Sequence, residues 1–164
     1  MIQNAAVKWN IEHRAAAQED EPMTTQEEVA AIRKLLKALP GCEKLHVRNG
    51  NGTAWGYVDI TGSADTNGHF TAKERRTLRE IGLGCIANAT HIEPDSRRYW
   101  IDRLQEIAVD QDYMASLREF VRQIEGGEVI FCRECWSWQE PEGKLDARGI
   151  ITICARCYSE HIDE

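Results

Sequence analysis

Four cysteines close to the C-terminal end of the chain are arranged as two Cys-x-x-Cys pairs. Cys132 and Cys135 form the first pair, and Cys154 and Cys157 form the second after 18 intervening residues. Each pair presents two sulfur atoms from one turn, and two such turns supply the tetrahedral shell of four thiolates that structural Zn²⁺ accepts. Residues 136–153 are typical of a hairpin that would bring the two pairs together. We therefore predict that these four cysteines bind one zinc ion.

The predicted zinc ion has a structural role. Four protein ligands leave no open coordination position for a substrate or an activated water molecule. A segment of roughly 30 residues buries too little apolar surface to fold alone, so the metal would contribute much of its folding free energy, on the order of 10–16 kcal/mol. A redox site needs only one Cys-x-x-Cys pair and a thioredoxin-like context, which this sequence lacks. Cys42 and Cys85 have no paired spacing and are predicted to be small buried hydrophobic residues.

Over residues 129–158 the sequence resembles the C4 zinc-ribbon proteins, and the two cysteine pairs carry this resemblance. It implies a ribbon fold and a bound zinc ion, and ribbons of this kind serve transcription, translation and protein contacts alike. A looser similarity connects residues 110–115 with the acidic hairpin tip of the DnaK-suppressor/TraR family, in which a helical hairpin precedes a C4 finger. The predicted helices here are shorter than that family's coiled coil, and the region before them has no place in it.

The bulk composition excludes several classes of protein. Hydrophobic residues make up 42% of the chain and charged residues 29%, so a packed core is compatible with the composition and wholesale disorder is not. The formal net charge of −7 excludes a globally basic nucleic-acid binder, although a local basic face is compatible with it. The sequence contains no apolar run of the roughly 18 residues that a membrane-spanning helix requires.

The N-terminal sequence does not show the features of a signal peptide. Lys8, Glu12 and Arg14 interrupt the apolar positions that such a segment needs. A protein that is not exported keeps its cysteines reduced, which favours metal binding over disulfide formation for the six cysteines. We therefore predict a cytoplasmic location.

Two helix starts are marked by capping boxes, in which a threonine is followed three positions later by a glutamate. The segments Thr24–Glu28 and Thr71–Glu74 both carry this pattern. An apolar stripe predicts that the first helix spans 26–39, and the second is predicted to run to Ile81.

Residues 44–62 alternate between polar and apolar positions and are predicted to form a β-hairpin. Its strands are Lys44–Arg48 and Thr53–Thr61, joined by a turn at Asn49–Gly52. The two-residue period assigns one face of the hairpin to the core. That face carries Leu45, Val47, Val58 and Ile60. The opposite face carries His46, Arg48, Trp55, Tyr57 and Asp59.

The remaining elements complete a prediction of an α+β fold. A short third strand is predicted at 85–87, and residues 95–125 have apolar positions every three or four residues, which predicts an antiparallel helical pair. The architecture is a small α-β-β-α unit plus this helical pair and a C-terminal zinc ribbon. The predicted organisation is an N-terminal arm over 1–22, an α+β domain over 23–126 and the C4 zinc ribbon over 127–164.

The uneven distribution of charge makes the hairpin region the candidate surface for nucleic acid. Residues 44–79 hold six positive and three negative residues (6 − 3 = +3), whereas residues 128–164 hold four and eight (4 − 8 = −4). Aromatic rings beside positive charges are what single-stranded nucleic acid requires. The candidate residues are His46, Arg48, Trp55, Tyr57, Arg75, Arg76 and Arg79. The alternative is that a helix covers this face and that the arginines are solvated helix positions.

The acidic ribbon favours a second kind of interaction. Its aromatic residues near the metal turns, Trp136, Trp138 and Tyr158, are candidate anchors for a basic protein partner. The alternative is that these rings pack over the ribbon itself. Because acidic surfaces repel phosphate, protein contact is the preferred interpretation for the ribbon.

One further pattern concerns catalysis. His91-Ile-Glu93, taken together with Cys132 and Cys135, superficially matches the zinc ligands and the proton-transferring glutamate of nucleobase deaminases. Phe131 stands where that pattern has proline, Pro94 directly follows the glutamate, and the second cysteine pair already completes a tetrahedral shell. No small-molecule substrate and no phosphate-binding glycine-rich loop is evident in the sequence.

These observations favour a non-enzymatic, zinc-binding adaptor or regulatory protein that contacts a protein partner and is associated with nucleic-acid processes. The first alternative is a protein that binds single-stranded or structured nucleic acid through the hairpin over 44–62. The second alternative is a zinc-dependent, deaminase-like enzyme. The predicted cofactor in the first two cases is one structural zinc ion.

Overall fold

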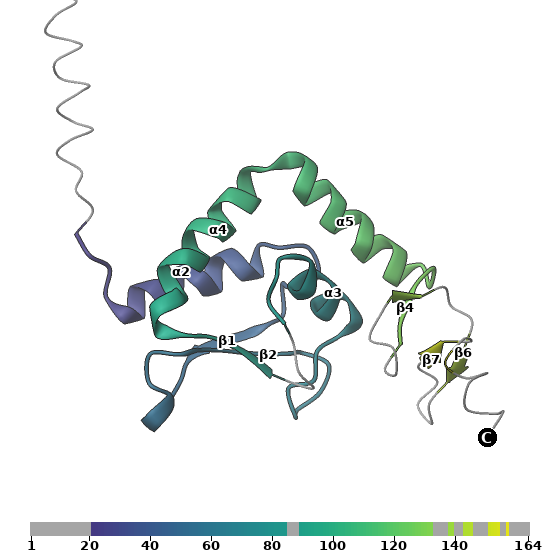
Figure 1. The fold of residues 1–164 in the computed structure, drawn as a ribbon, viewed down its shortest axis with the longest axis horizontal. Helices are drawn as coiled ribbons and strands as arrows, with labels where there is room; N and C mark the ends of the chain where they lie inside the picture. Colours follow the sequence, from purple (N-terminus) through teal and green to yellow (C-terminus); the bar gives the residue numbers. More distant parts are fainter. Residues whose placement is uncertain are drawn as a thin grey trace, which may run out of the picture.

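The computed structural model describes residues 21–84, 89–132, 138–139, 143–145, 151–154 and 157. The predicted N-terminal arm therefore lies outside the described residues as far as residue 20, and so does Cys85. In the described part, helices and a small three-stranded antiparallel sheet form the α+β arrangement that the sequence predicts (Figure 1). The main helices are α2 (Thr25–Lys37), α3 (Ala72–Glu80), α4 (Arg97–Val109) and α5 (Gln111–Glu125).

Side-chain caps explain where three of these helices begin. The hydroxyl of Thr24 accepts the backbone N–H of Glu27, and the Glu27 carboxylate accepts the backbone N–H of Thr24 at 2.7 Å. The same reciprocal pair of bonds joins Thr71 and Glu74 at the start of α3. Asp110 accepts the backbone N–H of Tyr113 and starts α5. Each cap satisfies backbone donors that have no partner within the helix.

The sheet consists of β1 (His46–Asn49), β2 (Val58–Thr61) and β3 (Ala89–Ile92), with β2 in the centre. Val47 lies opposite Ile60, and Val58 lies opposite Ile92, so apolar residues of all three strands share one face. The four residues assigned to the core from the alternation, Leu45, Val47, Val58 and Ile60, are all buried, which confirms that assignment.

The predicted strand over Thr53–Thr61 is wrong in its first half. Residues Gly52–Ala54 form the short 3-10 helix η1, and β2 begins only at Val58. The backbone at Gly56 has φ +90°, and its carbonyl accepts a hydrogen bond from Arg97 at 2.5 Å instead of pairing across the sheet. The loop conformation is therefore set by α4, which local alternation does not reveal.

The third strand of the sheet is β3, which spans Ala89–Ile92 and was not predicted. The strand predicted at 85–87 lies outside the described residues. Ile92 is buried against Val58. The other residues of β3 are exposed or half-buried, so no apolar alternation marks this strand in the sequence.

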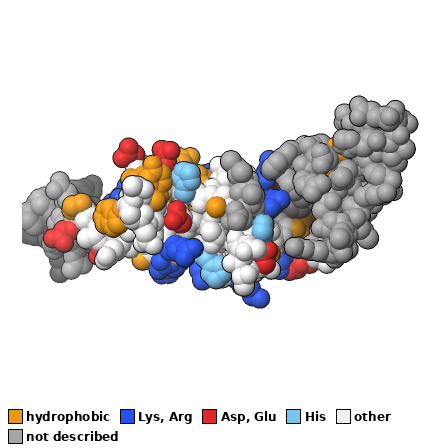
Figure 2. Space-filling view, turned by 90° about the horizontal axis from the view of Figure 1, so that it is seen from below, with side chains coloured by type: hydrophobic (Ala, Val, Ile, Leu, Met, Phe, Trp, Pro, Cys, Tyr) orange, Lys and Arg blue, Asp and Glu red, His pale blue; other side chains and the backbone are white. Residues whose placement is uncertain are grey.

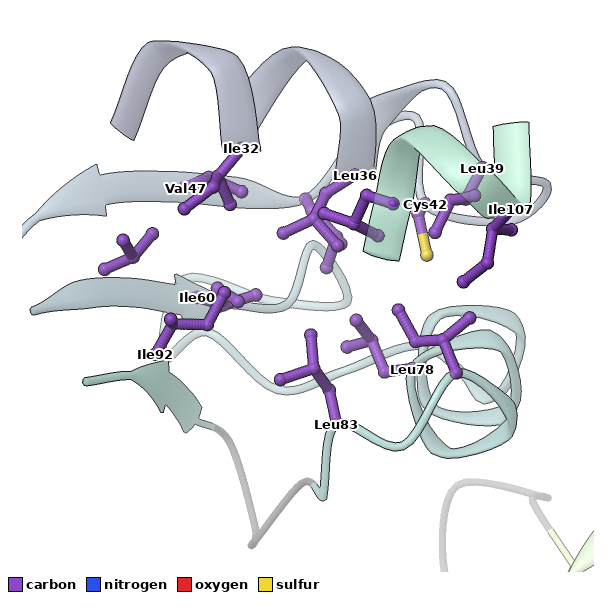
Figure 3. Packing of buried hydrophobic residues seen from close by; sticks show 14 of the residues in the cluster. Ile32, Leu36, Leu39, Cys42, Val47, Ile60, Leu78, Leu83, Ile92 and Ile107 are labelled. Atoms are coloured by element: carbon purple, nitrogen blue, oxygen red, sulfur yellow. The ribbon is translucent and has the colours of Figure 1, made fainter. Parts of the chain in front are cut away.

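The core lies between the sheet and the helices. Ile32 and Leu36 of α2 face Val47 and Ile60 of the sheet (Figure 3). Leu78 of α3 and Ile107 of α4 belong to the same buried cluster. Cys42 is buried in the same core, as the sequence predicted. Packing of this kind supplies most of the free energy that holds short strands and helices in place.

The helical pair differs from the antiparallel arrangement that was predicted. α4 packs against α2, whereas α5 diverges from α4 at Asp110 and packs against α3 (Figure 1). Each helix buries its apolar stripe on a different partner, since α4 buries Ile101, Leu104 and Ile107 but α5 buries only Leu117 completely. The described helices thus lie on one side of the sheet.

Arg97, the first residue of α4, links three elements. Its Nε donates to the carboxylate of Glu28 at 2.6 Å, and its Nη2 donates to the hydroxyl of Thr25 at 3.3 Å. Its Nη1 donates to the carbonyl of Gly56 in the β1–β2 loop. Both charged side chains are largely shielded from water, so this ion pair is screened less than a surface pair.

Short strands follow α5. They are β4 (Ile130–Phe131), β5 (Trp138–Gln139), β6 (Gly143–Leu145) and β7 (Ile151–Cys154). β4 pairs with β5, β6 pairs with β7, and β4 also lies against β7. Among the described residues, none of the helices combines the length and apolarity needed to cross a membrane.

Candidate binding surface and candidate metal centre

The face of the sheet that points away from the helices is the candidate binding surface. His46, Arg48, Asp59 and His91 lie on this face, because Arg48 is opposite Asp59 and Asp59 is opposite His91 in the strand register. His46, Arg48 and His91 are exposed, and Asp59 is half-buried. We call these four residues the open face. The covering helix considered as an alternative is not found among the described elements.

Trp55 stands beside the open face in the β1–β2 loop, and 62% of its surface is exposed. The sequence predicted that Trp55 lies in a strand, but Trp55 is the C-cap residue of η1. Its neighbour Gly56 is held from both sides, since its N–H donates to the side chain of Asn49 at 3.1 Å and its carbonyl accepts from Arg97. The loop therefore presents a large exposed ring on a well-anchored backbone.

Tyr57 follows in the same loop and is half-buried. Its ring packs edge-on against His91, with ring centroids 5.4 Å apart and an interplanar angle of 69°. Of the seven residues predicted for nucleic-acid contact, His46 and Arg48 therefore lie on the open face, and Tyr57 contacts it through His91. Trp55 lies in the loop that follows the Asn49 end of β1.

An open groove of about 470 Å³ runs along the outer edge of β1. Its basic side chains are Arg33 and Lys37 from α2 and His46 and Arg48 from β1; we call it the basic groove. Figure 2, which views the molecule from the sheet side, shows Lys and Arg side chains gathered beside histidine in the central part of this surface. In the described part of the chain, Arg33, Lys37 and Arg48 form no ion pair with a carboxylate.

The far wall of the basic groove is the loop that contains Asp65. One oxygen of the Asp65 carboxylate accepts the backbone N–H groups of Asn67 and His69, and the other lies 2.7 Å from Nδ1 of His69. Desolvation raises the pKa of Asp65. The hydrogen bonds from His69, the charge of His69 and the hydrogen bond from Asn67 outweigh this effect, so the pKa of Asp65 lies below its ordinary value. The carboxylate is therefore ionised at neutral pH, and its hydrogen bonds are made to residues of its own loop.

A buried carboxylate holds this loop in place. Glu74 is 1% exposed and accepts the backbone N–H of Ser63 at 3.1 Å and the Ser63 hydroxyl, in addition to its capping bond with Thr71. At Gly62 a side chain would meet the loop's own backbone, because a Cβ atom there would lie 2.2 Å from the carbonyl oxygen of His69. The loop that forms this wall of the groove is thus held by hydrogen bonds to a buried side chain.

The three arginines of α3 lie elsewhere. Arg76 is paired with Glu80 at 3.4 Å, and its guanidinium lies 4.1 Å from the centre of the Phe120 ring on α5. Arg75 is half-buried and Arg79 is exposed, and none of the three lines the basic groove. The charge of Arg76 thus contributes to the contact between α3 and α5.

The candidate metal centre follows β4. Cys132 is fully buried, Cys157 is 8% exposed, and the two form one buried cluster separate from the main core. One cysteine from each predicted pair therefore lies at the same place. Cys154 is the last residue of β7, which lies against β4; its side chain and the whole of Cys135 are outside the described residues. Two buried cysteines, one from each predicted pair, have the chemistry that a zinc site of the predicted type requires.

The residues of the deaminase-like pattern do not meet in the part of the chain that the structure describes. His91 is on β3, where it contacts Tyr57, and Cys132 is in the cluster beyond α5. No group of three or more metal-ligating side chains is assembled among the described residues. The aromatic candidates of the ribbon, Trp136, Trp138 and Tyr158, have no described side chains.

No family model, curated protein or solved structure matches this chain. The chemistry of the two sites just described is therefore the basis for assigning a function.

Two residues of the basic groove, Arg33 and Lys37, were not recognised from the sequence. Their spacing of four positions puts them on one side of a helix, next to the apolar stripe that includes Ile32 and Leu36. That spacing was the available signal. It acquires meaning only when β1 is placed beside α2, where Nε of Arg33 donates to the carbonyl of Val47 at 2.7 Å.

Proposed function

We propose that this chain is a non-enzymatic binding protein whose sheet surface binds single-stranded nucleic acid and whose C-terminal ribbon is stabilised by zinc. The observation that carries the proposal is the exposed Trp55 ring beside a sheet face that bears Arg48, His46 and His91 without a covering helix among the described elements. Successive bases of a single strand stack on exposed rings, while cationic side chains contact the backbone.

The electrostatics support a local rather than a global affinity for nucleic acid. The chain as a whole carries a formal charge of −7, which opposes non-specific attraction. The basic groove gathers cations that make no ion pair within the described residues, and the nearby Asp65 is occupied by His69. A ligand with a face for stacking and a chain of negative charges suits this surface better than an apolar ligand does.

Replacing Trp55 and Arg48 together by alanine tests the proposal. Loss of one base-stacking ring weakens single-strand binding by about 1–3 kcal/mol, roughly 5- to 140-fold in Kd, and the lost cation adds to this. Fluorescence anisotropy with a labelled oligonucleotide at low salt measures the effect. The Tyr99→Ala, Arg118→Ala variant is the matched control, because it removes an exposed ring on α4 and an exposed cation on α5.

Equal affinity of the wild type and the folded Trp55→Ala, Arg48→Ala variant would refute binding at this surface. Circular dichroism of both variants checks that the helices are retained. Trp55 is an exposed loop residue, so its removal is expected to leave the core intact.

Zinc has a supporting part in this proposal. Cys132, Cys135, Cys154 and Cys157 would hold the ion, and the ion would supply the cross-link that a short ribbon needs in order to fold. No catalytic step is assigned to it, because four cysteine ligands leave no position for a substrate.

We propose in addition that the ribbon makes protein contacts. Its net charge of −4, against +3 over residues 44–79, favours a basic partner. Affinity capture from nuclease-treated lysate, with the wild type and a Trp136→Ala, Trp138→Ala variant, tests this. A basic partner retained only by the wild type is the expected result, and identical partners for both proteins would contradict it.

A further inference from the structure

We propose that the basic groove binds the phosphodiester backbone of the same strand whose base stacks on Trp55. This inference rests on the proposed function and deepens it, because it assigns separate parts of the ligand to separate parts of the surface. Bases are assigned to the Trp55 end of the sheet, and phosphates are assigned to the groove along the outer edge of β1.

The groove and the Trp55 loop are both anchored on β1. Arg48 lines the groove, and the next residue, Asn49, accepts the N–H of Gly56 and so holds the Trp55 loop. His46 and Asn49, at the two ends of β1, are separated by about 10 Å of extended chain. A strand that stacks one base at the loop can therefore lay its neighbouring phosphates along β1 without a sharp bend.

The side chains of the groove are suited to phosphate. Arg33 is exposed but oriented, since its Nε donates to the carbonyl of Val47 and its side chain lines the groove. A guanidinium held in this way donates paired hydrogen bonds to phosphate oxygens with little further ordering. Lys37, at the last turn of the same helix, adds a second charge one helical turn away.

The same contact makes a peptide strand a poor occupant of the groove. An edge strand such as β1 can pair with an added strand only through its outward carbonyl and N–H groups. Arg33 already occupies the carbonyl of Val47, in the middle of β1. The groove is also lined mainly by charged and polar residues, which favours an anionic chain over an apolar one.

The test compares salt dependence in the Arg33→Gln, Lys37→Gln variant and the wild type, using a labelled oligodeoxythymidine of about 12 nucleotides. Each phosphate contact to a single strand contributes about 0.7 to the slope of log Kd against log salt concentration. We expect the variant to bind more weakly at low salt and its slope to be flatter by about 0.7–1.4. Lys34→Gln is the matched control, because Lys34 is an exposed lysine of α2 that does not line the groove.

An abasic oligomer, which keeps the sugar-phosphate chain but has no bases, separates the two parts of the ligand. The affinity for this oligomer is expected to be lower in the Arg33→Gln, Lys37→Gln variant than in the wild type, and unchanged in the Trp55→Ala variant. The single variant Lys37→Gln provides the same comparison if loss of the Arg33 bond to Val47 prevents folding.

The possible failures are distinguishable. A wild type that binds no oligonucleotide defeats the proposed function itself, as does binding to vesicles containing phosphatidylserine in place of oligonucleotide. If the wild type binds the oligonucleotide but the Arg33→Gln, Lys37→Gln and Lys37→Gln variants both keep the salt slope of the wild type, only the groove assignment is overturned.

Discussion

Replacing Cys132 by serine is expected to abolish stoichiometric zinc binding and to unfold the ribbon while α2 to α5 remain folded. Cys132 is fully buried and lies with Cys157 in one cluster, so a serine there would remove one of the four proposed ligands from a site that has no substitute. Apparent binding free energies for sites of this kind are on the order of 10–16 kcal/mol, more than the whole stability of many domains. This is the largest effect that we expect of any single substitution.

The zinc content of the purified wild type and variant, measured by elemental analysis, tests this expectation. Cys42→Ala is the matched control, because Cys42 is equally buried but belongs to the main core between α2 and β1. That variant should keep one zinc ion per chain although its core is less well packed. A wild type without stoichiometric zinc, or a Cys132→Ser variant that retains it, would rule out the proposed ligand set.

Leu36→Ala is expected to lower the free energy of unfolding of the α+β region by about 2–5 kcal/mol. Leu36 is fully buried in α2 and faces the sheet, so its removal leaves a cavity that the surrounding residues can close only in part (Figure 3). Urea unfolding monitored by the helical circular-dichroism signal measures the change, with an unaltered slope of free energy against urea as a check of two-state behaviour.

Leu35→Ala, the adjacent and only half-buried leucine of the same helix, is the control for Leu36→Ala. It has the same helix-forming preference and the same number of deleted atoms but removes fewer contacts, so we expect a clearly smaller loss of stability. Equal losses for the two variants would mean that α2 does not dock on the sheet through the face described above.

The elements that the sequence predicted well are those that are encoded locally. Both capping boxes carry the signal for a helix start within four residues, and α2 and α3 begin where Thr24 and Thr71 indicate. The core face of the sheet was predicted from strict alternation, and Val47 and Ile60 are buried accordingly. In each case the residues that form the structure are also the residues that display the pattern.

The features that the sequence did not predict depend on contacts between distant segments. The strand expected at Thr53 is replaced by η1 and a loop because Arg97, 41 positions beyond Gly56, binds the loop carbonyl. The divergence of α5 from α4 follows from its packing on α3, which no periodicity in α5 specifies. The basic groove likewise requires α2 and β1 to be placed side by side before Arg33 and Lys37 can be recognised as part of it.

The anchoring of Gly56 by Arg97 and Asn49 affects the conformational entropy that the Trp55 loop would lose on binding a ligand. A loop that must become ordered when it meets its ligand loses conformational entropy at that moment, and the affinity is reduced accordingly. Here the loop that carries Trp55 is already tied to α4 and β1, so this entropy is lost when the chain folds. The exposed ring is therefore preorganised, and the proposed stacking of a base on it would require no rearrangement of this loop.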